Sequence, residues 1–142
     1  MKLLKKIIRL LCIGSHRSDV PTGFVPLSDV HSAVVFTDPG DQGQVGALAA
    51  AHKFFSHLGI SVKTITASDR DIRTRSDLFI ALNSRKSIDE RYAAASSTAR
   101  FKIGRHQLRR QVYDVIVSDP DDVPAAADAA FRAISNILTT IK

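Results

Sequence analysis

From residue 31 onward, the chain alternates between short apolar runs and longer stretches of helix-forming residues, and this alternation constrains the fold more than any other feature. Residues 31–37, HSAVVFT, form a nearly continuous apolar run that is typical of a parallel strand buried on both faces. Residues 46–59 follow with good helix formers and end at Gly59, a residue that favours helix C-termini. A strand followed by a helix is the repeating unit of α/β proteins.

The same alternation continues to the C-terminus. The patterns predict strands at 61–66, 77–83, 100–104 and 113–119, and helices at 87–99 and 121–141. Ser87 and Glu90 have the spacing of a capping box, which marks the start of a helix. The connections 66–77 and 104–113 are short for helical crossovers, so either one strand runs antiparallel or the strand order jumps.

These elements predict one three-layer α/β domain, with a mostly parallel five-stranded sheet and helices on both of its faces, Rossmann-like or flavodoxin-like. The length of 142 residues and a hydrophobic fraction of 44% suit a single soluble domain with its own core. The expected organisation is a basic amphipathic helix at 1–17, a linker at 18–30 and the α/β domain at 31–142.

The N-terminal sequence MKLLKKIIRLLCIG places leucine and isoleucine on one face of a helix and cations on the other. Five of the 20 basic residues precede the first acid, Asp19, so the remaining 15 nearly balance the 14 acids. The residues predicted to contact an anionic membrane or a protein partner are Lys2, Lys5, Lys6 and Arg9. The aliphatic face would then lie in the acyl boundary. Alternatively, that face packs on the domain or on a second copy in a homodimer.

The N-terminal helix does not have the features of a secretion signal. Lys5, Lys6 and Arg9 interrupt any apolar core, and no small-x-small cleavage site follows. No uncharged apolar run approaches the roughly 20 residues that span a bilayer. The single cysteine, Cys12, excludes an internal disulfide and suits a reducing compartment. We therefore expect a cytoplasmic protein, peripheral to the inner membrane if its helix binds lipid.

Polar residues follow the ends of several predicted strands, where open α/β sheets bind their ligands. The candidate ligand-binding residues are Asp38, Gly40 and Gly43 after the first strand, Asn83 after the third, Arg105 after the fourth and Asp119 after the last. Together with a helix N-terminus, they would hold a phosphorylated metabolite or nucleotide. Each also has a structural interpretation, because Asp-Pro pairs begin turns and asparagine caps helices.

Recognisable catalytic and cofactor motifs are absent from the sequence. Gly40, Gly43 and Gly46 give G-x-x-G-x-x-G, which matches neither the dinucleotide fingerprint nor the P-loop. His52 and His57 are five residues apart and do not face one metal on a helix. We therefore predict no metal and no cofactor. With no Trp and two Tyr, the chain also lacks the stacking residues of single-strand binders, which disfavours sequence-specific nucleic-acid recognition.

The blocks DLFIALN, ARFKIGRH and YDVIVSD resemble, in order and spacing, a family of short uncharacterised bacterial α/β proteins known only as a domain of unknown function. The resemblance covers about residues 31–119 and extends to the basic N-terminal helix. It implies a fold and no mechanism. The sequence thus favours a non-enzymatic binding or interaction module that attaches to a membrane surface or a partner through its N-terminal helix. The alternative is a binder of, or enzyme acting on, a phosphorylated metabolite or nucleotide at the strand ends.

Overall fold

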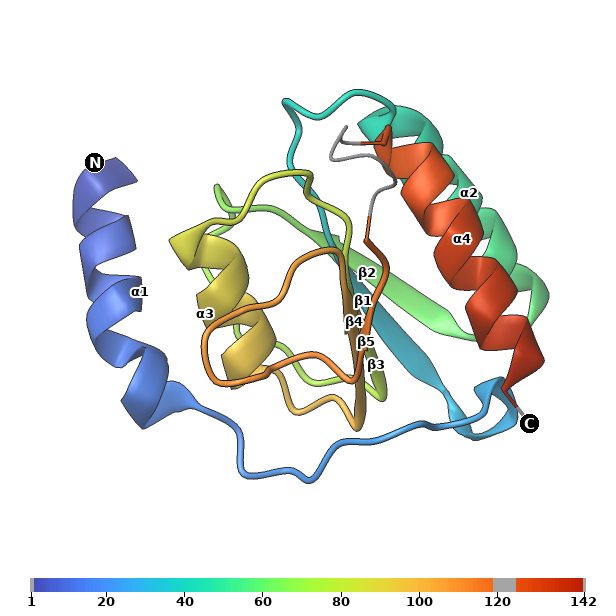
Figure 1. Cartoon of the computed structure of the whole chain (residues 1–142), viewed down its shortest axis with the longest axis horizontal. Coiled ribbons are helices and arrows are strands. Elements are labelled where there is room, and N and C mark those ends of the chain that lie inside the picture. Colours follow the sequence, from blue (N-terminus) through green and yellow to red (C-terminus); the bar gives the residue numbers. More distant parts are fainter. Residues whose placement is uncertain (1, 119–124, 142) are drawn as a thin grey trace.

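A computed structural model, which describes residues 2–118 and 125–141, shows a parallel sheet between two layers of helices (Figure 1). The sheet has five strands in the order β2-β1-β3-β4-β5, and each of its four pairings is parallel in the described residues. The elements are α1 (Lys2–His16), a 3₁₀ turn (Leu27–Asp29), β1 (Ser32–Phe36), α2 (Gln44–His57), β2 (Ser61–Ile65), β3 (Leu78–Ala81), α3 (Ile88–Ser96), β4 (Phe101–Gly104), β5 (Val115–Ile116) and α4 (Ala127–Thr140).

The three-layer α/β prediction is therefore confirmed, and the strand order is that of flavodoxin-like doubly wound sheets. The suggestion of an antiparallel strand is wrong. The strand order jumps instead, because the connection 66–77 leaves β2 at the sheet edge and passes β1 to enter β3. The connection 105–114 joins the neighbouring parallel strands β4 and β5 without a helix.

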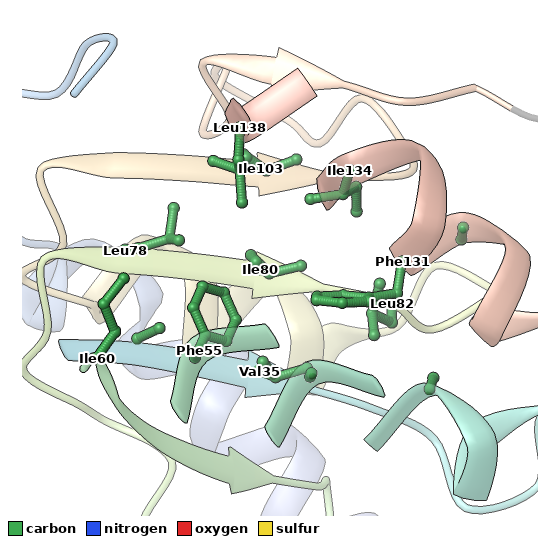
Figure 2. Close-up of a cluster of buried hydrophobic side chains, with 14 of the residues drawn as sticks. Val35, Phe55, Ile60, Leu78, Ile80, Leu82, Ile103, Phe131, Ile134 and Leu138 are labelled. Atoms are coloured by element: carbon green, nitrogen blue, oxygen red, sulfur yellow. The ribbon is translucent and has the colours of Figure 1, made fainter. Parts of the chain in front are cut away.

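One face of the sheet is covered by α2 and α4. Phe55 of α2 and Phe131 of α4 pack in an edge-to-face arrangement, with ring centroids 6.1 Å apart, over the inward side chains of the central strands (Figure 2). Alternate residues of β1 divide between the two faces: Val35 belongs to this cluster, while Val34 packs on the opposite side. The continuous apolar pattern of this strand thus reflects burial on both faces.

The opposite face is covered by α3 and by the two connections that lack helices. Ile72 from the first connection, and Leu108 and Val112 from the second, are buried there with the alanines of α3. These side chains cover sheet area that crossover helices would otherwise cover. Lys102 of β4 is also buried on this side, and its Nζ donates to the carbonyl of Ala94 near the C-terminal end of α3 (2.7 Å).

Helix α1 packs against the outer side of α3, so it is the outermost element on that side of the sheet (Figure 1). Its cationic face is turned toward the domain: Arg9 is 5% exposed, whereas Leu11 is 76% exposed. Of the alternatives for this face, packing on the domain is therefore wrong. From α1 the chain continues through residues 17–31, which pass the amino end of β4, and then enters β1 (Figure 1). In this segment the Gly23 N–H donates to the carbonyl of Arg100, the residue before β4.

Gly104, the last residue of β4, lies directly under the ring of Tyr113. A Cβ at position 104 would lie 2.2 Å from Tyr113 Cε2, and the ring is fixed because its hydroxyl donates to buried Glu90 (2.6 Å). The "IG" of the FKIGRH block is thus required by the close approach of the second connection to the strand.

We predict that Gly104→Ala destabilises the fold by about 2–3 kcal/mol, because either the ring or the strand must move. The free energy of unfolding in urea measures this effect. Gly14→Ala is the matched control, since nothing lies within 4 Å of its added Cβ. Equal stability of the two variants would contradict the proposed packing.

Candidate functional site

A pocket of about 660 Å³ opens at the carboxyl ends of the strands, beside the boundary between β1 and β3. This boundary is the point where the strand order reverses, and doubly wound sheets bind ligands there. Its walls come from α1, from the ends of β1 and β2 and from the segment that leads from β3 into α3. The lining residues are Lys5, Lys6, Phe36, Thr37, Asp38, Pro39, Ala67, Ser68, Asn83, Arg85, Lys86, Ser87 and Asp89.

Two of the predicted ligand-binding residues, Asp38 and Asn83, meet in this pocket. Asp38 is exposed, and its Oδ1 accepts from the backbone N–H of Gly40 (2.9 Å), which gives the Asp-Pro turn that the sequence indicates. Gly40 itself lines a smaller hollow of about 440 Å³ that shares Asp38 and Arg85 with the first. Asp38, Gly40 and Asn83 therefore line two adjoining hollows at the carboxyl ends of the strands.

The other predicted ligand-binding residues do not line this pocket. Gly43 has a φ of 79° and immediately precedes α2, where an added Cβ would lie 2.6 Å from Asp128. Arg105 is 4% exposed and donates to the carbonyls of Leu82 and Ala125 (both 2.9 Å), so it ties the end of β3 to the chain before α4. Asp119 lies outside the described residues.

The sequence has a second group of cations, Arg100, Lys102, Arg105, Arg109 and Arg110, of which Lys102 and Arg105 are buried and the other three are exposed. Lys102 and Arg105 both point to backbone carbonyls, and Arg100 bonds to the Asp29 carbonyl and lies 3.5 Å from Asp77. Burial, together with the nearby charge of Arg17, lowers the pKa of Lys102 to about 8. Lys102 and Arg105 thus serve the fold, and these five cations do not form one continuous exposed surface.

A buried polar network supports the pocket from below. Glu90 is fully buried, and its carboxylate accepts from Asn83 Nδ2 (2.5 Å) and from the Tyr113 hydroxyl (2.6 Å). Ser87 accepts from the Glu90 N–H (3.0 Å), which confirms Ser87 as the N-cap. Burial raises the pKa of Glu90, although the hydrogen bonds from Tyr113 and Asn83 oppose that effect. The network fixes Asn83 between the strand end and α3.

The α1 side of the pocket is held by an ion-pair cluster in which Arg9 and Asp89 are buried and Lys6 is partly exposed. Lys6 Nζ donates to Asp89 Oδ2 (2.6 Å) and Arg9 Nη1 donates to Asp89 Oδ1 (2.8 Å), so each carboxylate oxygen has a cationic partner. Arg9 also donates to the carbonyls of Ala67 and Asp69 (both 2.9 Å). Burial alone would raise the pKa of Asp89, but the hydrogen bonds from Lys6 and Arg9 outweigh it and the pKa lies below its usual value.

The pocket contains functional candidates that sequence patterns alone did not single out. Arg85 and Lys86 lie in the segment between β3 and α3 and are exposed at the pocket. A cationic dipeptide between a strand end and the N-cap Ser87 is the signal that would have indicated them. Lys5 and Lys6, predicted as membrane or partner contacts, also line the pocket, whereas the side chain of Lys2 is not described.

No protein-family model, curated protein or solved structure matches this chain.

We predict that Glu90 makes the unfolding free energy depend on pH above its ordinary pKa of 4.5. Because its folded-state pKa is raised, the folded chain holds a proton there that the unfolded chain has released. The unfolding free energy contributed by this group therefore falls as pH rises through that window. Urea denaturation of the wild type and Glu90→Gln between pH 4.5 and 7 should show the wild type losing stability relative to the variant. Parallel pH profiles of the unfolding free energy for the wild type and Glu90→Gln would contradict a raised pKa of Glu90 in the folded state.

We further predict that Asp89→Asn releases α1 while leaving the sheet folded, because Arg9 would remain beside the domain without a counter-charge. Amide hydrogen exchange in α1 should accelerate more than ten-fold, with no change in β1 or β3. Asp71→Asn, an exposed acid on the neighbouring connection, is the control. Unchanged exchange in α1 would show that the ion pairs do not hold the helix.

Proposed function

We propose that this protein is an α/β binding module that α1 attaches to an anionic membrane surface. The observation that carries this proposal is the direction of the aliphatic face. Of the eleven large apolar side chains that are exposed in the described part of the chain, six belong to α1: Leu3, Leu4, Ile7, Ile8, Leu10 and Leu11. A contiguous exposed apolar face of this kind marks an interaction site.

The charge around this face favours an anionic partner. Lys5 and Lys6 are half-buried beside its N-terminal half, and they share the pocket with exposed Arg85 and Lys86. At the other end of α1, Arg17 donates to the carbonyl of Arg110, an exposed residue. Cations therefore flank the aliphatic face at both ends, where lipid headgroups would lie if the leucines entered the acyl boundary.

The expected free energies of burial and of charge attraction agree with reversible membrane binding that needs both contributions. Burying a half-exposed leucine or isoleucine yields about 1 kcal/mol, so six of them give on the order of 5 kcal/mol, which alone corresponds to sub-millimolar binding. Each nearby cation adds about 1 kcal/mol on an anionic surface. No helix in the described ranges is long and apolar enough to cross a membrane, so this attachment would be to the surface.

A second copy of the chain fits the same face less well. Each copy carries a net charge of +6, so two copies repel each other through their overall charge. An anionic bilayer has the complementary charge.

The test is vesicle flotation of the full-length protein with phosphatidylglycerol-containing and purely zwitterionic vesicles. We expect binding to the anionic vesicles that weakens with added salt. Leu4→Gln/Leu11→Gln should lower the partition coefficient about 30-fold, since two buried side chains contribute about 2 kcal/mol. Glutamine keeps the helix propensity high.

Val45→Gln/Leu58→Gln is the matched control, because it removes two exposed apolar side chains from α2 and its C-cap, on the opposite face of the sheet. It should bind as the wild type does. Equal binding of the two double variants, or no binding by the wild type, would exclude the proposal. Concentration-dependent dimerisation that is lost only in Leu4→Gln/Leu11→Gln would assign the face to a second copy instead.

A further inference from the structure

We propose that the pocket between α1 and the strand ends binds the phosphate monoester of a hydroxylated organic compound. This inference does not rest on membrane attachment, because the pocket and the aliphatic face are formed by different side chains. The volume of about 660 Å³ lies in the range of small-molecule sites.

The cations of the pocket supply the phosphate-binding component. Four of them line it, against the two carboxylates Asp38 and Asp89. Asp89 is already neutralised by Lys6 and Arg9. Among the described residues, the Arg85 guanidinium and the Lys86 ammonium make no hydrogen bond or ion pair, so both are available to a ligand. An arginine can bind two phosphate oxygens at once, and a lysine adds a point charge.

These two cations lie beside the start of α3. Ser87 and Asp89, at the N-cap and second position of this nine-residue helix, both line the pocket. Backbone N–H groups at such a position favour an anion and add to the field of the cations. A dianion seated here would thus meet positive potential from both side chains and backbone.

The remaining wall suits the body of the ligand. Asn83, 3% exposed, forms part of the wall, and its Oδ1 is enclosed behind the pocket surface. Exposed Asp38 provides a carboxylate acceptor in the same pocket. A carboxylate beside the cations can accept hydrogen bonds from hydroxyl groups on the compound that carries the phosphate. Phe36, Pro39 and Ala67 give the pocket an apolar portion against which a sugar or a base can pack.

Thermal unfolding of the full-length protein tests this with ribose 5-phosphate and AMP as probes, and with ribose and adenosine as the matched compounds without phosphate. At about 100 times Kd, a phosphate ester should raise Tm by about 5–10 °C. A second arm uses dihexanoyl phosphatidate below its micelle concentration, which presents the same phosphate group as a lipid headgroup. A rise in Tm with either kind of compound supports the site. A rise with ribose 5-phosphate or AMP indicates a soluble phosphate ester, and a rise with dihexanoyl phosphatidate alone indicates a lipid headgroup.

Arg85→Ala/Lys86→Ala should abolish the shift, because both side chains are exposed and unbonded and their loss leaves the fold intact. Lys53→Ala/Arg132→Ala removes the same charge from exposed positions on α2 and α4, and should keep the shift. Flat curves in both arms overturn the proposal. An equal shift in the two double variants, or an equal shift with ribose or adenosine, overturns it as well. None of these outcomes depends on vesicle binding, so this proposal and the membrane proposal fail separately.

Discussion

The buried carboxylate of Asp89 determines how the outer layer of this protein is arranged. It lies in the first turn of α3, is 2% exposed, and has one cation of α1 on each oxygen. A buried carboxylate without such partners would be strongly unfavourable. The orientation of α1 follows from this pairing: its cations face the domain, and its leucines and isoleucines face outward.

This arrangement reverses the usual preference of an amphipathic helix. Turning α1 over would bury its aliphatic side chains, each worth about 1–3 kcal/mol when fully covered. It would also leave Asp89 without its cationic partners. The carbonyls of Ala67 and Asp69 would lose the hydrogen bonds that Arg9 donates. Removing one partner of a buried ion pair costs about 3–5 kcal/mol, and this cost opposes the hydrophobic gain. The same helix thus forms one wall of the pocket and presents an aliphatic face away from the domain.

The sheet could be predicted from the sequence because its signals are local. Three such signals depend only on neighbouring residues: the apolar run of β1, the capping spacing of Ser87 and Glu90, and the position of Gly59. The structure has β1, the start of α3 and the end of α2 where these signals predict them. The paths of the two non-helical connections could not be predicted, since their side chains replace helices only through long-range packing. Asp38 and Asn83 line one pocket because the strand-end rule is geometric. The rule does not distinguish them from Arg105, whose guanidinium donates to backbone carbonyls, because the sequence pattern of a cation after a strand is the same in both cases. The orientation of α1 depends on one distant acid that no periodicity reveals.

The most direct test of this account is the solvent accessibility of the α1 methyl groups, measured by NMR with a soluble paramagnetic agent in the absence of lipid. We expect strong relaxation enhancement for Leu4, Ile7, Ile8 and Leu11, and protection of Ile13, which is 8% exposed on the same helix. Protected leucine and isoleucine methyls at all of these positions would show that the aliphatic face packs on the domain, and would contradict the role assigned to Asp89.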